Sequence, residues 1–236
     1  MSFPTTPSFR LDNKRSLVTG AGKGIGFELV KWFLGKNHNV WAISRNIKKL
    51  NKIESDNLFK SSVDITNEVE IKNWVNGTKN LKFDILVNNA GYLINKPFEK
   101  TSINEFKQIY DVNVFGLVSI TKKIIPMMKS ESHIVNISSM GGITGTQKFP
   151  GLSAYSSSKG AVSILTELLA EEYKETGPYF NSLALGSVQT EMLQKAFPGY
   201  NSNLSPKKIA DYICKFALEG HNFYNGKVLP VTTSNP

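Results

Sequence analysis

The chain has 236 residues, of which 40% are hydrophobic and 20% charged, proportions typical of a globular domain with one sizeable core. It contains no apolar run near the roughly 18 residues that span a bilayer, so we expect no membrane partner. The single cysteine, Cys214, excludes an internal disulfide and is typical of a reducing compartment, which favours a cytoplasmic location. The net charge is +9, but the lysines are spread without a dense tract, so we expect no nucleic-acid partner. Three scattered histidines show no metal-ligand spacing, and we expect no metal.

Residues 1–13 contain Pro, Ser and Thr but no apolar signal-peptide core, and they predict a flexible leader before a single domain over residues 14–236. In that domain short apolar runs alternate with amphipathic stretches. The predicted strands are Ser16–Val18, Asn39–Ser44, Leu58–Val63, Asp84–Asn88, His133–Ile137, Tyr179–Ala184 and Lys227–Val231. The predicted helices are Gly24–Leu34, Glu68–Asn76, Ile103–Met128, Ala154–Lys174 and Pro206–Leu218. This alternation predicts an α/β fold, with a parallel sheet of about seven strands flanked by helices.

Two of the predicted helices have recognisable starts. Ser102 followed by Glu105 predicts a capping box, in which each residue satisfies an unpaired backbone amide of the other. Ser205 followed by Pro206 predicts an N-cap with proline at the first helical position. These signals support the predicted helix boundaries.

A glycine-rich turn, TGAGKGIG at residues 19–26, directly follows the first predicted strand and opens the first helix. Glycines permit a tight turn and let a ligand approach the backbone, while the helix start offers free N–H groups to a pyrophosphate. Lys23 is followed by Gly24, so the turn is not an ATP-type phosphate loop. The position of the turn predicts dinucleotide binding.

The end of the second predicted strand bears on the choice between NAD and NADP. An acidic residue there binds the ribose 2′-hydroxyl of NAD, whereas an arginine accommodates the 2′-phosphate of NADP. The sequence has Ser44 and Arg45 at this place and no acid, and Lys23 adds a second cation. We therefore expect a preference for NADP(H), with NAD(H) possible. The alternative is that Arg45 is only a solvated residue at a strand end.

Tyr155 and Lys159 are four residues apart in a predicted helix and so share one face. A lysine ammonium beside a phenol favours the phenolate, so we expect Lys159 to lower the pKa of Tyr155. Such a tyrosine can exchange a proton with a carbonyl or an alcohol. The pair alone is weak evidence, because the same spacing occurs by chance on solvated helices.

Together these motifs resemble the single-domain branch of the short-chain dehydrogenase/reductase family. The resemblance covers Lys14 to about Val231, with NNAG at residues 88–91, NVFG at 113–116, ISSMGG at 137–142 and the Tyr155–Lys159 pair in the family's order. It implies a Rossmann-type doubly wound parallel sheet. The combination of Lys23 and Arg45 is similar to NADPH-preferring carbonyl and xylulose reductases of the family.

The resemblance implies a role for each matching residue. Asn113, Ser139, Tyr155 and Lys159 correspond to the catalytic set, in which tyrosine donates the proton, serine binds the carbonyl oxygen, lysine holds the ribose, and asparagine fixes a relay water. Thr190 corresponds to the threonine that holds the nicotinamide carboxamide. The implied cofactor site comprises Gly20, Gly22, Lys23, Gly24, Ile25, Gly26, Ser44, Arg45, Asp64, Ile65, Asn89, Ala90, Gly91, Tyr155, Lys159, Gly186, Val188 and Thr190.

Some of these residues have structural alternatives. Ser138 is an alternative to Ser139, Asn113 can simply bridge backbone groups, and Asn88 and Asn89 are expected to be structural. Cys214 lies among apolar neighbours, which favours a small buried core residue.

The sequence departs from the family pattern at three places. First, the loop between Ser139 and Tyr155 is long. Second, Leu185-Gly186 stands where the family has Pro-Gly, and the loss of proline is expected to loosen this turn. Third, the segment between Thr190 and Ser205 is short. The composition of these segments favours an apolar or aromatic carbonyl substrate. The residues expected to line its pocket are Tyr92, Met140, Phe149, Leu152 and Met192.

The sequence therefore predicts an NADP(H)-dependent oxidoreductase that interconverts a small-molecule carbonyl and a secondary alcohol, with reduction the favoured direction in a reducing cytoplasm. Two alternatives stay open. One is an NAD-linked alcohol dehydrogenase of the same family, and the other is a non-catalytic NADP-binding regulatory protein. The resemblance also implies a homodimer or homotetramer, formed through the helices at Ile103–Met128 and Ala154–Lys174.

Overall fold

A computed structural model describes residues 13–233, so the predicted leader at residues 1–13 lies almost entirely outside the described residues. Seven strands form one sheet in the order β3-β2-β1-β4-β5-β6-β7, and every neighbouring pair is parallel. This is the predicted doubly wound sheet. The strands are β1 (Arg15–Thr19), β2 (Asn39–Ser44), β3 (Leu58–Ser62), β4 (Phe83–Asn88), β5 (Met128–Ser139), β6 (Tyr179–Leu185) and β7 (Lys227–Val231).

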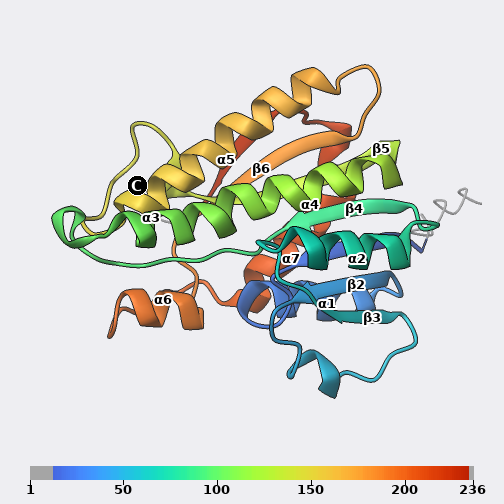
Figure 1. The fold of residues 1–236 in the computed structure, drawn as a ribbon, viewed down its shortest axis with the longest axis horizontal. Helices are drawn as coiled ribbons and strands as arrows, with labels where there is room; N and C mark the ends of the chain where they lie inside the picture. The colour runs from blue at the N-terminus through green and yellow to red at the C-terminus, as the bar shows by residue number, and fades with distance from the viewer. Residues whose placement is uncertain (1–12, 234–236) are drawn as a thin grey trace, which may run out of the picture.

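Helices cover both faces of this sheet. Figure 1 looks onto the face covered by α2, α4 and α5, with α1 and α7 behind the sheet and α6 standing apart from it. Because parallel strands connected by helices are buried on both sides, their sequences read as continuous apolar runs. The helices are α1 (Gly24–Gly35), α2 (Glu68–Thr78), α3 (Ile103–Tyr110), α4 (Leu117–Ile124), α5 (Ser153–Glu172), α6 (Glu191–Ala196) and α7 (Pro206–Glu219).

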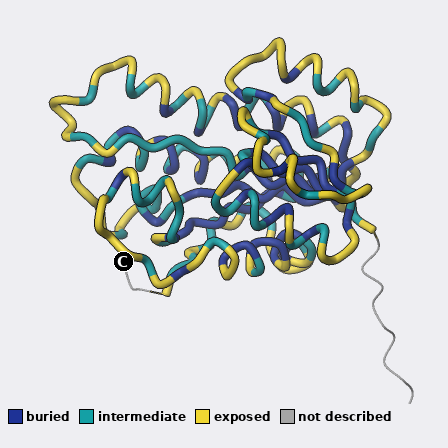
Figure 2. Tube along the Cα trace, turned by 90° about the horizontal axis from the view of Figure 1, so that it is seen from below, coloured by how far each residue is buried: buried dark blue, intermediate teal, exposed yellow. Residues whose placement is uncertain are grey.

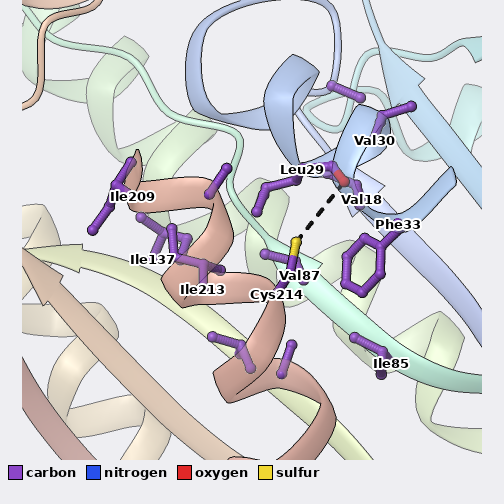
Figure 3. Close-up of a cluster of buried hydrophobic side chains, with 14 of the residues drawn as sticks. Val18, Leu29, Val30, Phe33, Ile85, Val87, Ile137, Ile209, Ile213 and Cys214 are labelled. Carbon is purple, nitrogen blue, oxygen red and sulfur yellow. Dashed lines mark hydrogen bonds between the residues drawn. The ribbon is translucent and has the colours of Figure 1, made fainter. Parts of the chain in front are cut away.

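The two faces of the sheet carry two hydrophobic cores. On one face, side chains of α1 and α7 pack on β1, β4 and β5, as Figure 3 shows, and Cys214 lies among them. On the other face, residues of α2, α4 and α5 pack on the opposite sides of the same strands. Figure 2 shows the buried strands running through the middle of the molecule, with exposed segments at its periphery. Burial raises the pKa of the Cys214 thiol and confirms the prediction of a core residue.

The prediction of one long helix over Ile103–Met128 is wrong. The segment is α3, then a π-helical turn (Asp111–Gly116), then α4, and it ends in a 3-10 turn (Ile125–Met127). Pro126 lacks the amide that would continue α4, and β5 already begins at Met128. π-helical turns in α-helices are often found at functional sites, and this one contains Asn113.

The other boundaries agree closely with the sequence patterns. The capping box of Ser102 and Glu105 is present, and the Ser205 hydroxyl caps α7 as predicted. The short helix α6 was not predicted, since six residues carry too little periodicity to be recognised. β5 starts five residues earlier than predicted, because residues 129–131 (KSE) near its start are polar and exposed and carry no apolar strand pattern.

A chain of buried amide and hydroxyl groups ties α4 and α5 to the sheet. Asn88 Nδ2 donates to Thr121 Oγ1 and to Asn136 Oδ1, both at 2.9 Å. Asn136 Nδ2 in turn donates to Thr166 Oγ1 at 2.9 Å. The expected structural role of Asn88 is confirmed, because these bonds fix the strands and helices that carry the candidate site.

Candidate active site

The glycine-rich turn between β1 and α1 has the shape that its composition predicts. Gly20 and Gly24 have φ of +65° and +55°, where glycine is favoured. A Cβ on Gly20 would lie 2.7 Å from the Ala90 Cα, and one on Gly26 would lie 2.5 Å from the Asn89 Nδ2. At Gly22 a Cβ would overlap the Asn46 carbonyl oxygen. Close packing therefore requires glycine at several positions of this turn.

Asn89 and Thr19 fasten the glycine-rich turn to the end of β4. Thr19 Oγ1 accepts from the amides of Asn89 and Ala90, both at 3.0 Å, while Asn89 Nδ2 donates to Thr19 O at 3.0 Å. Asn89 thus has the structural role expected of it. No side chain caps the first turn of α1, so its amide N–H groups are available to an anionic ligand.

A cavity of about 550 Å³ lies at the carboxyl ends of the strands, between this turn, α5 and α6. Ligands of open α/β sheets bind at this edge. Gly22, Gly26 and Asn113 are the predicted site residues that do not line it, and they support the walls instead. The predicted residues that do line it are Gly20, Lys23, Gly24, Ile25, Ser44, Arg45, Asp64, Ile65, Asn89, Ala90, Gly91, Ser139, Tyr155, Lys159, Gly186, Val188 and Thr190.

The charged groups of the cavity gather at the glycine-turn end. Arg45 Nη1 lies 4.0 Å from Asp64 Oδ2, and its side chain is 65% exposed. Glu191, at the start of α6, lies 2.8 Å from Lys49 Nζ and 3.8 Å from Lys23 Nζ. The hydrogen bond from Lys49 lowers the pKa of Glu191. Sequence reasoning missed Lys49 and Glu191, because nothing in the sequence shows that residues 142 positions apart meet.

Ser139 and Tyr155 meet at the opposite end of the cavity. Ser139 ends β5, and its hydroxyl accepts a hydrogen bond from the Gly141 amide at 3.3 Å. Tyr155 lies in the first turn of α5. Burial raises the pKa of Tyr155 to about 12, against a smaller lowering by its hydrogen bond with Ser139. The net pKa of Tyr155 is thus raised and not lowered as expected, since loss of hydration outweighs the favourable contacts of the phenolate.

Lys159 is a buried lysine one turn after Tyr155. Its Nζ lies 5.9 Å from the centre of the Tyr155 ring and donates to the Ile137 carbonyl at 2.8 Å. Burial lowers the pKa of Lys159 to about 8. The lysine ammonium therefore lies near the Tyr155 ring, and its pKa is near the physiological range.

Asn113 braces the site from behind the cavity wall. Its Oδ1 accepts from the Tyr92 amide at 2.8 Å, and its Nδ2 donates to Tyr92 O at 3.0 Å and to Ser158 Oγ at 2.9 Å. The Ser158 hydroxyl donates to the Tyr155 carbonyl at 2.6 Å. The structural alternative for Asn113 is thus present in the structure, and its role in holding a relay water stays a prediction.

The two serines that end β5 have different partners. Ser138 is 2% exposed, and its hydroxyl donates to Lys159 O at 2.9 Å and lies 3.1 Å from Ser163 Oγ. It thereby joins β5 to α5. Ser139 contacts Tyr155, so it is the better candidate for binding a reacting oxygen.

The far end of the cavity is closed by the long loop after Ser139 and by α6. Met140, Phe149, Leu152 and Met192 line it as predicted, whereas Tyr92 does not. Thr190 Oγ1 caps α6 by accepting from the Leu193 amide at 3.2 Å. The wall therefore depends on two segments in which this chain departs from the family pattern.

The turn after β6 is held by the edge strand. The Gly186 amide donates to Val231 O at 3.0 Å, and Leu185 pairs with Val231 in the sheet. A Cβ on Gly186 would lie 2.5 Å from Thr232 Oγ1. The turn with Leu185 in place of proline is therefore joined to β7, and the expected loosening stays a prediction.

Within residues 13–233, no three His, Cys, Asp or Glu side chains gather in a group able to hold a metal ion. None of the helices described there combines the length and apolar character that crossing a bilayer requires.

Comparison with known proteins defines the class. The family model described as short chain dehydrogenase matches residues 14–201, and the chain belongs to this family of oxidoreductases. An uncharacterized oxidoreductase of Staphylococcus saprophyticus is 31% identical over 212 residues, which are 85% of this chain and 89% of that protein.

Solved structures agree with the family and with its fold. The 3-ketoacyl-(acyl-carrier-protein) reductase of Brucella melitensis, complexed with NADH, has a TM-score of 0.84 and 29% identity over 94% of this chain and 98% of its own. ElxO with NADP bound has a TM-score of 0.81 and 29% identity over 93% and 97%. Similar proteins thus bind either form of the nicotinamide cofactor.

Proposed function

We propose that the protein is an NADP(H)-dependent oxidoreductase that interconverts an aldehyde or ketone and the corresponding alcohol, with Tyr155 as the general acid and base. The observation that carries this proposal is that Ser139, Tyr155 and Lys159 line the same cavity as the glycine-rich turn. A dinucleotide fits this cavity, since the crowded glycines keep side chains out of the turn and the start of α1 is uncapped.

The protein's own residues supply proton transfer and charge stabilisation. A bound nicotinamide supplies or accepts the hydride. Tyr155, with a pKa of about 12, is protonated at neutral pH and donates its proton to the substrate oxygen during reduction. Ser139 donates a hydrogen bond to the same oxygen, and the Lys159 ammonium stabilises the phenolate left behind. The protonated phenol is the form that the reductive step requires.

The choice between the two cofactors depends on the charged end of the cavity. Lys23 and Arg45 can bind a 2′-phosphate, which supports NADP(H). Asp64 and Glu191 oppose them, because each forms an ion pair with one of these cations. The NADH-bound neighbour supports the alternative of an NAD-linked alcohol dehydrogenase.

Replacing Arg45 with Asp is expected to weaken NADPH binding at least tenfold and NADH binding less than threefold. The change removes a phosphate ligand and adds a negative charge beside the 2′-position. Fluorescence titration of both cofactors measures the effect. Lys52→Asp, an equal charge change on an exposed residue outside the cavity, is the control. Equal losses for the two cofactors would show that Arg45 does not bind the phosphate.

Carbonyl reduction is expected to slow as the pH rises through about 8. Lys159 is a cation below its pKa of about 8, and deprotonation removes the charge that stabilises the phenolate. The pH profile of kcat/KM should therefore fall with unit slope above this value. In Lys159→Met the fall near pH 8 should disappear and the whole profile should lie lower. A wild-type profile that is flat from pH 6 to 10 would contradict the role of Lys159.

Assembly into a homodimer or homotetramer stays a prediction. Along α5, Val162 is fully buried in the core, whereas Ile164 and Leu168 are 58% and 60% exposed. Phe115, near the start of α4, is 58% exposed as well. These exposed apolar side chains support the expected pairing through the helices of this face.

A further inference from the structure

We propose that the substrate is a neutral, apolar carbonyl compound. This inference rests on the proposed function and specifies the substrate of the same site. It depends on how the far end of the cavity is built and on which charges are missing there.

The wall of this end is a fixed structure made of three segments. Asn95 Nδ2 donates to the Ala196 carbonyl at the end of α6 at 2.7 Å. The Lys96 amide donates to Gly151 O at 2.9 Å, which fastens the long loop to the same segment. Gly151 has φ of +86°, and any side chain there would overlap Asn95. The loop and α6 are therefore held in fixed positions around the space beyond Tyr155.

Apolar side chains form the surface of that space. Met140 and Leu152 line this space and are buried. Phe149 of the loop and Phe197 after α6 meet edge to face at 6.4 Å. Phe149 nevertheless remains 50% exposed, at the rim of the cavity. An apolar ring that is partly uncovered at the mouth of a binding cavity offers area for a ligand to bury.

Few charged groups face this apolar end of the cavity. Among the charged residues that line the cavity, all but Lys159 lie at the cofactor end, as the ion pairs of Lys23 and Arg45 show. Lys159 already donates to a backbone carbonyl. Lys148 of the loop does not line the cavity, and its ammonium bonds the Ile143 carbonyl and Thr146.

A carboxylate or phosphate on the substrate would therefore lose its hydration without gaining a dedicated counter-ion, which is costly. Gln147 is the polar side chain of the loop that lines the cavity, and it offers a neutral donor and acceptor. The geometry thus selects neutral substrates by penalising charged ones.

The test compares ethyl benzoylformate with benzoylformate, which share one reacting ketone and differ in the charge of the neighbouring group. NADPH consumption measures kcat/KM, and quenching of NADPH fluorescence in the Tyr155→Phe complex measures binding without turnover. We expect the ester to exceed the acid at least 100-fold in kcat/KM and at least 30-fold in affinity.

Two variants locate the origin of this preference. Gln147→Arg places a cation at the rim and should shift the ester-to-acid ratio at least tenfold towards the acid. Lys148→Gln, the neighbouring change outside the cavity, should leave the ratio within twofold of wild type.

The outcomes separate the substrate class from the proposed activity. Binding that prefers the ester, without turnover of either probe by the wild type, would contradict the activity and support the substrate class. Equal affinity for the two probes, tighter binding of the acid, or binding of neither would overturn the substrate class, even if other carbonyls are reduced. An ester-to-acid ratio of Gln147→Arg equal to that of wild type would also contradict the proposed substrate class.

Discussion

Replacing Tyr155 with Phe is expected to lower kcat for carbonyl reduction by about a thousandfold, within the range that general acid catalysis contributes. The change removes only the hydroxyl, whose pKa of about 12 keeps it protonated and ready to donate at neutral pH. The ring still fills its place in the first turn of α5, so the affinity for NADPH should change less than threefold. Stopped-flow measurement of a single turnover isolates the chemical step from product release.

Tyr173→Phe is the matched control for this variant, because Tyr173 is the C-cap of the same helix and does not line the cavity. It should retain wild-type turnover. If Tyr155→Phe kept more than a tenth of the wild-type rate, another group would be the proton donor. The same experiment separates an enzyme from a non-catalytic NADP-binding regulatory protein. If Tyr155→Phe binds NADPH as wild type does but loses turnover, the protein is an enzyme, since a regulator would have no turnover to lose.

The second large effect is a loss of stability in acid caused by His133. This histidine is 1% exposed, and its Nδ1 bonds Ala217 O while its Nε2 bonds Asn181 Nδ2, both at 3.0 Å. Nε2 therefore accepts and must be unprotonated. Burial lowers the pKa of His133 from 6.5 to about 3.

Because the folded pKa lies below the unfolded value, the stabilisation from neutral His133 is complete above pH 6.5 and is lost as the pH falls towards 3. One proton contributes about 1.4 kcal/mol per pH unit, so the free energy of unfolding should fall by about 2 kcal/mol between pH 6.5 and 5 from this group. Urea unfolding at these two pH values measures the change.

His133→Gln should remove most of this pH dependence, because an amide can hydrogen-bond without titrating. His38→Gln, a change at another buried histidine that makes no contact with His133 in the described structure, should retain most of the loss. A His133→Gln protein that weakens in acid as steeply as wild type would contradict the assignment. A variant that is less stable than wild type, but whose free energy of unfolding changes little between pH 6.5 and 5, would still agree with it.

Much of the fold was predictable because it depends on local patterns. The five inner strands contain apolar runs buried on both faces, and the alternation of strands with helices predicts a parallel sheet. The helix over Ile103–Met128 was predicted wrongly because its apolar periodicity continues through both breaks. The π-helical turn packs closely on a segment distant in sequence, since a Cβ on Gly116 would lie 2.9 Å from Ile65 Cγ1.

The candidate site was predictable where its residues belong to recognisable sequence motifs. The glycine-rich turn, Tyr155 and Lys159 line one cavity, as their spacing indicated. The pKa of Tyr155 was not predictable, since it depends on burial that only the packed structure shows. The ion pairs of Glu191 and the hydrogen bond from Asn95 to α6 could not be predicted from the sequence either, because each joins segments about a hundred residues or more apart.

The measurement that tests the proposed function most directly is the titration of purified protein with NADPH and NADH, followed by addition of ethyl benzoylformate and other neutral ketones and aldehydes to the cofactor complex. We expect tight binding of NADPH, weaker binding of NADH and consumption of NADPH when a neutral carbonyl is present. Binding of neither cofactor would contradict the proposed function, because the glycine-rich turn, Arg45 and Lys159 would then have no shared ligand.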